Sequence, residues 1–428
     1  MTRIVFVLLL CLVIFSLMVQ PATAQTKPAA AAPEPAYEVL KLSETLFELR
    51  VDIGYVVKVL ASIGPDGVLL VDTGLQENGK DLLATLRKLG GGEPKIVILS
   101  HSHEEHWAGN RVLGPGPLYI GHENMRKRLQ SGPFLFLELP EGILPRLTVK
   151  DEMSVFFNGE EIRIRSFAGA HDNSDLVVWF TKSKAAFVGA LVTALKLPTV
   201  DGTTGDIRRY PEITRHVLDF LPEDVKLIPG HGEDASHAQG LQFLEMLEKT
   251  AALVKAEIAK GRDLDTLTKE DLLKDWQSWE VSYSNRAYWL RALYEGYSGA
   301  TAARNALTPI HDQLYAAYKA KGSDGAVRKY LELKAQHPKE YRFDVRTLYG
   351  IADALQGQGK DRDSIPFFEL AIKEFPESPF ARAIHDSVSQ AYVAVGDKPS
   401  ALQHLKKVLE LDPKNEDAAK RIKELEGR

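Results

Sequence analysis

The pattern of apolar and polar residues changes near residue 236 and predicts two kinds of structure. Before this point, short β-branched runs alternate with turns: "YVVKVLASI", "GVLLVDTG", "KIVILSH", "EIRIRSFAG", "DLVVWF", "AAFVGALV" and "VKLIPGHG". Helical patterns lie between them, for example at residues 79–89 and 213–220. Strand-rich runs interleaved with helices indicate an α/β domain whose helices cover sheets, and we place it at residues 37–235.

From residue 236 onward the pattern is helical. "AQGLQFLEMLEKTAALVKAEIAKG" repeats apolar residues at the spacing of one helix face, and Gly261 ends the segment. We therefore expect a helical extension at residues 236–300, followed by an all-α region at 301–428.

The region 301–428 contains a repeat. Gly322, Gly359 and Gly396 lie 37 residues apart, and each begins a unit with an amphipathic segment that ends at Pro338, Pro376 or Pro413. This spacing resembles tetratricopeptide repeats, whose period is about 34 residues. We expect a stack of helix pairs whose surface binds a protein partner or a second copy of the chain. The alternative is an ordinary helical bundle.

The first 36 residues differ from the rest. A basic start, an apolar run at residues 4–19 and "ATA" at residues 22–24 predict a secretory signal peptide cleaved after Ala24. An Ala/Pro-rich linker follows at residues 25–36. We expect a periplasmic or secreted protein without a stable membrane span after cleavage. The alternative is an uncleaved anchor, because a run of this length nearly spans a bilayer.

Composition narrows the chemistry. The formal net charge is −5, and no long basic run indicates nucleic-acid binding. The one cysteine, Cys11, lies inside the apolar run and would leave with the signal peptide. The mature chain would then have neither a disulfide framework nor a cysteine metal ligand, so any metal site must use His, Asp and Glu.

Histidines gather after predicted strands. "ILSHSHEEHWAGN", residues 98–110, holds three of the 12 histidines, and His171, His231 and Asp72 also follow strand patterns. Loops at strand ends converge on one edge of a layered α/β fold. Imidazole and carboxylate together suit zinc, although these ligand types do not exclude iron. We interpret the remaining histidines as structural: His122, His216, His237, His311, His337, His385 and His404.

The motifs resemble those of the metallo-β-lactamase superfamily. "HSHEEH" resembles its H-x-H-x-D-H signature, and "VDTG", "AGAHDNSD" and "IPGHG" resemble its other segments in the same order. The resemblance covers residues 37–235 and implies an αββα sandwich with metals at one edge. It also implies metal ligands in two sets: His101, His103 and His171 for one ion, and Glu105, His106 and His231 for the other.

The resemblance further implies a zinc-dependent hydrolase with one or two ions. Its metal-bound hydroxide would act on an ester, amide or lactam-type bond of a small molecule, with a β-lactam as the sharpest candidate. Glu105 and Asp72 are the expected catalytic residues. Asp72 would act by hydrogen-bonding a ligand histidine or the motif backbone.

Two positions depart from the family pattern. Glu105 stands where the family has aspartate, and Glu104 is the alternative ligand. Ala190 stands where many family hydrolases have an aspartate that bridges both metals. The ligand set therefore most resembles β-lactamases without a bridging carboxylate, or a centre whose second site is weakly filled.

The sequence is also compatible with two functions other than hydrolysis. An iron-containing oxidoreductase on the same fold is one alternative, and a repeat-based binding protein with a degenerate metal domain is another. In the loop 195–210, Arg208 or Arg209 would meet a substrate carboxylate if the loop flanks the site. Otherwise the loop is simply solvated.

Overall fold

The computed structural model describes residues 37–428, except for 132–135, 137–138, 379, 414 and 428. The predicted signal peptide at 1–24 and the predicted linker at 25–36 lie outside the described residues. Within the described part of the chain, no helix has the length and apolar character that a bilayer span needs.

The β-branched runs form two main sheets. The larger has seven strands, antiparallel from β1 to β4 and parallel from β4 to β7. In sheet order these are β1 (Glu38–Lys41), β2 (Leu46–Asp52), β3 (Val56–Gly64), β4 (Gly67–Val71), β5 (Pro94–Ile98), β6 (Leu118–His122) and β7 (Leu147–Val149).

The second sheet has five strands. Its order is β12 (Lys226–Pro229), β11 (Ala185–Gly189), β10 (Leu176–Phe180), β9 (Glu160–Ser166) and β8 (Glu152–Phe157). Its strands are antiparallel except for the pair β11 and β12. Because β11 and β12 run in the same direction, the loops after both strands leave the sheet at the same edge.

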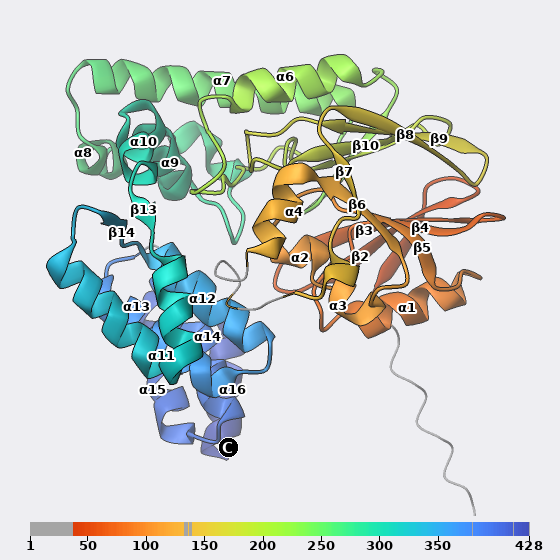
Figure 1. The fold of residues 1–428 in the computed structure, drawn as a ribbon. Helices are drawn as coiled ribbons and strands as arrows, with labels where there is room; N and C mark the ends of the chain where they lie inside the picture. The colour runs from red at the N-terminus through yellow and green to blue at the C-terminus, as the bar shows by residue number, and fades with distance from the viewer. Residues whose placement is uncertain (1–36, 132–135, 137–138, 379, 414, 428) are drawn as a thin grey trace, which may run out of the picture. The chain divides into compact units, whose positions relative to one another are not determined.

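Helices pack against these sheets (Figure 1). They are α1 (Gly79–Lys88), α2 (Glu104–Trp107), α3 (Asn110–Leu113), α4 (Glu123–Gln130), the 3₁₀ turn η1 (Glu141–Ile143) and α6 (Tyr210–Phe220). One apolar cluster joins side chains of both sheets, such as Leu60 and Ile98 with Ile164 and Phe187. Separate clusters lie under α1 and under α6, so each sheet buries apolar residues on both faces.

The chain after residue 236 is helical, apart from the two-residue strands β13 (Thr308–Pro309) and β14 (Tyr341–Arg342). Its elements are α7 (His237–Ala259), α8 (Leu264–Lys269), η2 (Lys274–Trp279), α9 (Arg286–Tyr297), α10 (Ala300–Asn305), α11 (His311–Gln336), α12 (Val345–Gly357), α13 (Asp361–Glu374), α14 (Ala381–Ala394), α15 (Lys398–Leu411) and α16 (Glu416–Glu426). The protein is therefore an α/β sheet domain followed by a C-terminal helical region.

The two regions share apolar packing. Phe136 lies between α4 and η1 in the sheet domain, yet its side chain is buried in the apolar cluster of the helical region. Its ring centroid lies 5.4 Å from that of Tyr315, 5.3 Å from Tyr318 and 5.5 Å from Phe367. The described residues from 37 onward accordingly belong to one compact unit.

Candidate metal centre

The structure brings together all six residues predicted as metal ligands. His101 and His103 follow β5, Glu105 and His106 lie on α2, and His171 and His231 follow β9 and β12. Their side chains form two groups in which ligand atoms lie within 4.8 Å of one another. The groups are His101, His103 and His171, and Glu105, His106 and His231, which are the two sets that the family resemblance implies.

In the first group, His103 Nδ1 and His171 Nε2 lie 3.1 Å apart. The other nitrogen of each ring is held elsewhere: His171 Nδ1 lies 2.8 Å from Thr199 O, and His103 Nε2 lies 3.3 Å from Asp201 Oδ2. Because a carbonyl or carboxylate oxygen only accepts, these outer nitrogens carry the protons. The two facing nitrogens then present lone pairs to each other, which favours a cation between them.

His101 completes this group. Its Nδ1 lies 2.9 Å from Ser100 Oγ, whose own proton goes to Asp72 Oδ2 at 2.7 Å, so His101 Nδ1 is the donor. His101 Nε2 is then an unprotonated nitrogen, and it is buried without a hydrogen-bond partner among the described residues. A buried acceptor without a partner costs stability unless something else binds it, and a metal ion would do so.

The second group repeats this arrangement. His106 Nε2 and His231 Nε2 lie 3.1 Å apart, while their Nδ1 atoms lie 2.8 Å from Asp72 Oδ2 and 3.0 Å from Val56 O. Glu105 Oε1 lies 3.5 Å from His231 Nε2. Two neutral imidazoles with one carboxylate are a ligand set that suits zinc, so the residues present fit the metal.

Burial and charge favour the ligating forms of His101, His171 and Glu105. Burial and the neighbouring histidines lower the pKa of His101 well below its ordinary value. Burial and His103 lower the pKa of His171 to about 3. Burial also lowers the pKa of His103, but the hydrogen bond to Asp201 and the nearby carboxylates outweigh it and raise that pKa overall. Burial raises the pKa of Glu105, but the hydrogen bond to His231 and the nearby histidines outweigh it and lower the pKa overall. Neutral imidazoles and an ionised carboxylate bind metal without first losing protons.

Asp72 connects the two groups. It is fully buried, has φ 64°, and accepts hydrogen bonds from Ser100 N at 2.7 Å and from His106 Nδ1. Through Ser100 Oγ it also fixes the orientation of His101. Asp72 is therefore a positioning residue that holds one histidine of each group.

The structure shows the surroundings of Glu105 and Ala190, the two positions that depart from the family pattern. Glu104 Oε1 lies 3.0 Å from Arg111 Nη1, so Glu105 and not Glu104 contributes to the group. Gly189, at the end of β11, lies against the side chains of Ser100 and His101. Ala190 follows it and uses its carbonyl oxygen to accept from Tyr210 Oη, so this position offers no carboxylate to either group.

A cavity of about 450 Å³ opens over both groups. His103, Glu105, His171 and His231 line one wall. Tyr55 and Tyr283 flank His231, with ring centroids 5.3 and 5.7 Å from the imidazole. The opposite wall comes from the helical region and includes Arg346, Tyr349, Asp353 and Phe380, which sequence reasoning did not select because no motif marks them.

The loop 195–210 does border this cavity, but through Thr199, Val200, Asp201, Gly202 and Thr203. Arg208 lies elsewhere and pairs with Asp206 at 2.7 Å. Arg209 lies over Gly169 and lines a different hollow on the surface. Neither arginine is among the residues that line the cavity over the metal groups.

Comparison with known proteins gives one family match and several similar solved structures. The family model described as the metallo-beta-lactamase superfamily matches residues 54–239. No curated protein matches the chain. Similar solved structures include a metallo-beta-lactamase from Pontibacter korlensis, at 20% identity and a TM-score of 0.44, covering 50% of this chain and 99% of that one. The DIM-1 metallo-beta-lactamase is 23% identical, with a TM-score of 0.44, covering 50% of this chain and 98% of that one.

The matched residues span both histidine groups and end in the first turn of α7. The superfamily is mostly hydrolytic and its members bind metal ions. Residues 54–239 are therefore a metallo-β-lactamase superfamily domain, joined in this chain to a C-terminal helical region.

Proposed function

We propose that the protein is a zinc-dependent hydrolase that cleaves an ester, amide or lactam-type bond, with a β-lactam as the first candidate. One observation carries this proposal. In each group two imidazole nitrogens face each other at 3.1 Å while their outer nitrogens are held by an acceptor. Such a pre-oriented arrangement is typical of a metal centre, and the superfamily is mostly hydrolytic.

The six side chains would hold one ion in each group. Zinc bound there supplies a Lewis acid and lowers the pKa of water to about 7. The ligand rings are kept in place by hydrogen-bond acceptors on their outer nitrogens, which are Asp72, Thr199 O, Asp201 and Val56 O. Tyr55 and Tyr283 shield His231 from solvent, which strengthens electrostatic interactions within the site.

The test combines metal content with turnover. Protein consisting of residues 25–428 is purified without added metal, and zinc per chain is measured by mass spectrometry beside hydrolysis of a chromogenic cephalosporin and a 4-nitrophenyl ester. We expect zinc to be present and at least one substrate to be cleaved. The variant His103→Ala should lose zinc and turnover, whereas His216→Ala, on the exposed side of α6, should retain both. Absence of zinc, or a different metal with redox activity, would contradict the proposal.

We also propose an αββα sandwich, C-terminal helix-pair repeats and secretion of the mature protein. The apolar cluster between the sheets, together with the clusters under α1 and α6, supports an αββα sandwich at 37–235. Positive φ values of 66°, 70° and 85° at Gly322, Gly359 and Gly396 support helix-pair repeats in 301–428, after a helical extension at 236–300. Secretion after cleavage behind Ala24 rests on the sequence alone, and N-terminal sequencing of secreted protein would test it.

A further inference from the structure

The helix α12 presents one face to the candidate metal centre. Arg346, Tyr349 and Asp353 are spaced as i, i+3 and i+7, which places them on one side of a helix, and all three line the cavity over the two histidine groups. Phe380, just before α14, completes this wall. The helical region therefore shapes the space that a substrate would occupy.

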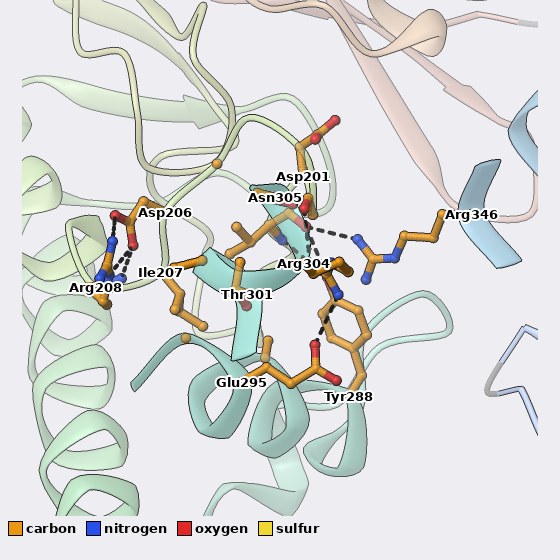
Figure 2. Close-up of a pocket in the computed structure, with 16 residues that line it drawn as sticks. Asp201, Asp206, Ile207, Arg208, Tyr288, Glu295, Thr301, Arg304, Asn305 and Arg346 are labelled. Carbon is orange, nitrogen blue, oxygen red and sulfur yellow. Dashed lines mark hydrogen bonds and ion pairs between the residues drawn. The ribbon is translucent and has the colours of Figure 1, made fainter. Parts of the chain in front are cut away.

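Arg346 reaches the loop that orients two candidate ligands. Its Nη1 lies 3.5 Å from Val200 O. The residue before Val200 accepts a hydrogen bond from His171, and the residue after it holds His103. Figure 2 shows the Arg346 guanidinium extended toward the loop that carries Asp201, with the ring of Tyr288 nearby. The guanidinium lies 5.8 Å from the Tyr288 ring centroid and 5.4 Å from that of Phe380.

Arg346 lacks a carboxylate partner, unlike its neighbours. Arg128 Nη2 lies 3.0 Å from Asp201 Oδ2, and Arg304 Nη1 lies 3.2 Å from Glu295 Oε2. Over the described residues, no carboxylate oxygen comes within 4.0 Å of an Arg346 nitrogen. A guanidinium keeps its charge and has five N–H donors, so Arg346 has donors left for a ligand.

The charges around the cavity are unevenly placed. Asp353 lies on the Glu105 side, where burial and Glu105 raise the pKa of Asp353 to about 6. Glu104, beside it, is occupied by Arg111. Arg346 instead meets the Val200 side of the cavity, where Asp201 is already paired with Arg128. An anionic group that enters the cavity would therefore meet, at Arg346, a guanidinium that forms no ion pair with a carboxylate of the described residues.

We propose that Arg346 binds a carboxylate of the substrate and so makes the helical region the selector of anionic substrates. A planar guanidinium can bind a carboxylate through two parallel hydrogen bonds, and the rings of Tyr288 and Phe380 hold it in place. This inference rests on the proposed hydrolase function for its kinetic consequences, but the binding itself does not require turnover.

The kinetic test uses two esters that differ by one charge: the 4-nitrophenyl monoester of adipic acid, with a free carboxylate, and its methyl ester. For the zinc-loaded full chain, we expect Arg346→Met to raise KM for the carboxylate ester by roughly 10- to 100-fold and to leave kcat nearly unchanged. The methyl ester should be unaffected. Arg304→Met is the matched control, because Arg304 is paired and lies outside the cavity over the histidines.

A binding measurement separates this inference from the proposed activity. Calorimetry with metal-free full-length protein compares the two intact esters. We expect wild-type protein to prefer the carboxylate ester, Arg346→Met to lose that preference, and Arg346→Lys to keep part of it with an unchanged melting temperature. No preference in wild type, or a preference that survives in Arg346→Met, would overturn the inference. If zinc-loaded wild-type protein cleaves neither ester, the proposed ester hydrolysis is contradicted. The proposal for Arg346 is not affected by that result, because calorimetry measures binding without turnover.

Discussion

His171 Nε2 lies 3.1 Å from His103 Nδ1, and the other nitrogen of each ring is hydrogen-bonded to the same short loop. Thr199 O accepts from one ring, and the Asp201 carboxylate accepts from the other. The loop 199–201 therefore sets the separation of two candidate ligands, although none of its residues belongs to the histidine motifs.

Asp201→Asn should weaken zinc binding at the first group. The substitution preserves the shape of the side chain but removes the charge that orients His103 and pairs with Arg128. Loss of such a supporting carboxylate typically lowers metal affinity by about 10- to 100-fold. Competition titration with a chromophoric chelator measures the change. An unchanged affinity would mean that Asp201 supports only the loop.

Glu105→Gln should weaken zinc binding at the second group and leave the first group filled. The amide keeps the length of the side chain but loses the negative charge beside His231. Zinc per chain should fall toward one in dilute protein, as measured by mass spectrometry. Glu104→Gln is the matched control, because Glu104 faces Arg111. A larger zinc loss in Glu104→Gln than in Glu105→Gln would reverse our ligand assignment.

Lys58→Met should destabilise the sheet domain. Lys58 is fully buried in β3, with its Nζ 2.6 Å from Asp234 Oδ1 and 3.2 Å from Glu48 Oε1, and Glu48 is also fully buried. Removing one partner of a buried ion pair costs about 3–5 kcal/mol, and Arg50, 2.6 Å from Glu48, should hold the loss near the lower end. Urea unfolding gives the free energy. If the double variant Lys58→Met/Glu48→Leu is no more stable than Lys58→Met, the loss does not come from the uncompensated carboxylate.

The helical region should lose stability in mild acid through His385. Its Nδ1 lies 2.8 Å from His404 Nδ1, and burial, His404 and Lys407 lower the pKa of His385 from 6.5 to about 4, against opposing contributions from Glu369 and Glu410. Between these values the unfolded chain binds a proton that the folded chain does not. This contribution to stability is therefore complete above pH 6.5 and is lost as the pH falls toward 4.

The variant His385→Gln isolates this effect. The drop in melting temperature between pH 7.5 and pH 5.0 should be smaller than in wild type by about 2–4 °C. Glutamine cannot titrate, so it removes the proton linkage while keeping a polar side chain. An equal drop in both proteins would assign the acid sensitivity to other groups.

The sequence was most informative where the determinants are local. Continuous β-branched runs predicted β4, β5, β10 and β11. Nearly all side chains of β4, β10 and β11 are buried, and in β5 only Lys95 is exposed. The strands β1, β2, β6, β7 and β8 were not predicted. In β2, apolar residues alternate with Glu48 and Arg50 and form no continuous β-branched run. β1 and β7 are short, β6 contains a glycine and a histidine, and β8 carries the exposed Phe156. Their conformation depends on pairing with a neighbouring strand, as for β1 with β2 and for β8 with β9.

The residues of the candidate site also fall into those that a local motif marks and those that it does not. The six candidate ligands and Asp72 stand in motifs whose spacing follows from strands that end at one edge. Asp201 and Arg346 have no such signature. Asp201 lies in a polar loop, and Arg346 is one of many charged residues on amphipathic helices. A backbone hydrogen bond from Asp201 N to His171 O places Asp201 beside the histidines, and a contact with Val200 O places Arg346 there. A pattern of local periodicity carries no information on either contact.

The burial of Phe136 makes the two regions difficult to separate. The chain passes from the part that contains the sheets and α7 to α9 to the part that contains α11 to α16 once in sequence, through the segment around α10. Phe136 makes a second connection between these two parts, and it is not covalent. Proteolytic cleavage between Gly299 and Leu307 would break the first connection and leave the second. The two fragments of such a nicked protein should co-elute under native conditions and separate only in denaturant. The cavity wall that carries Arg346 would then stay in place after the peptide bond is cut.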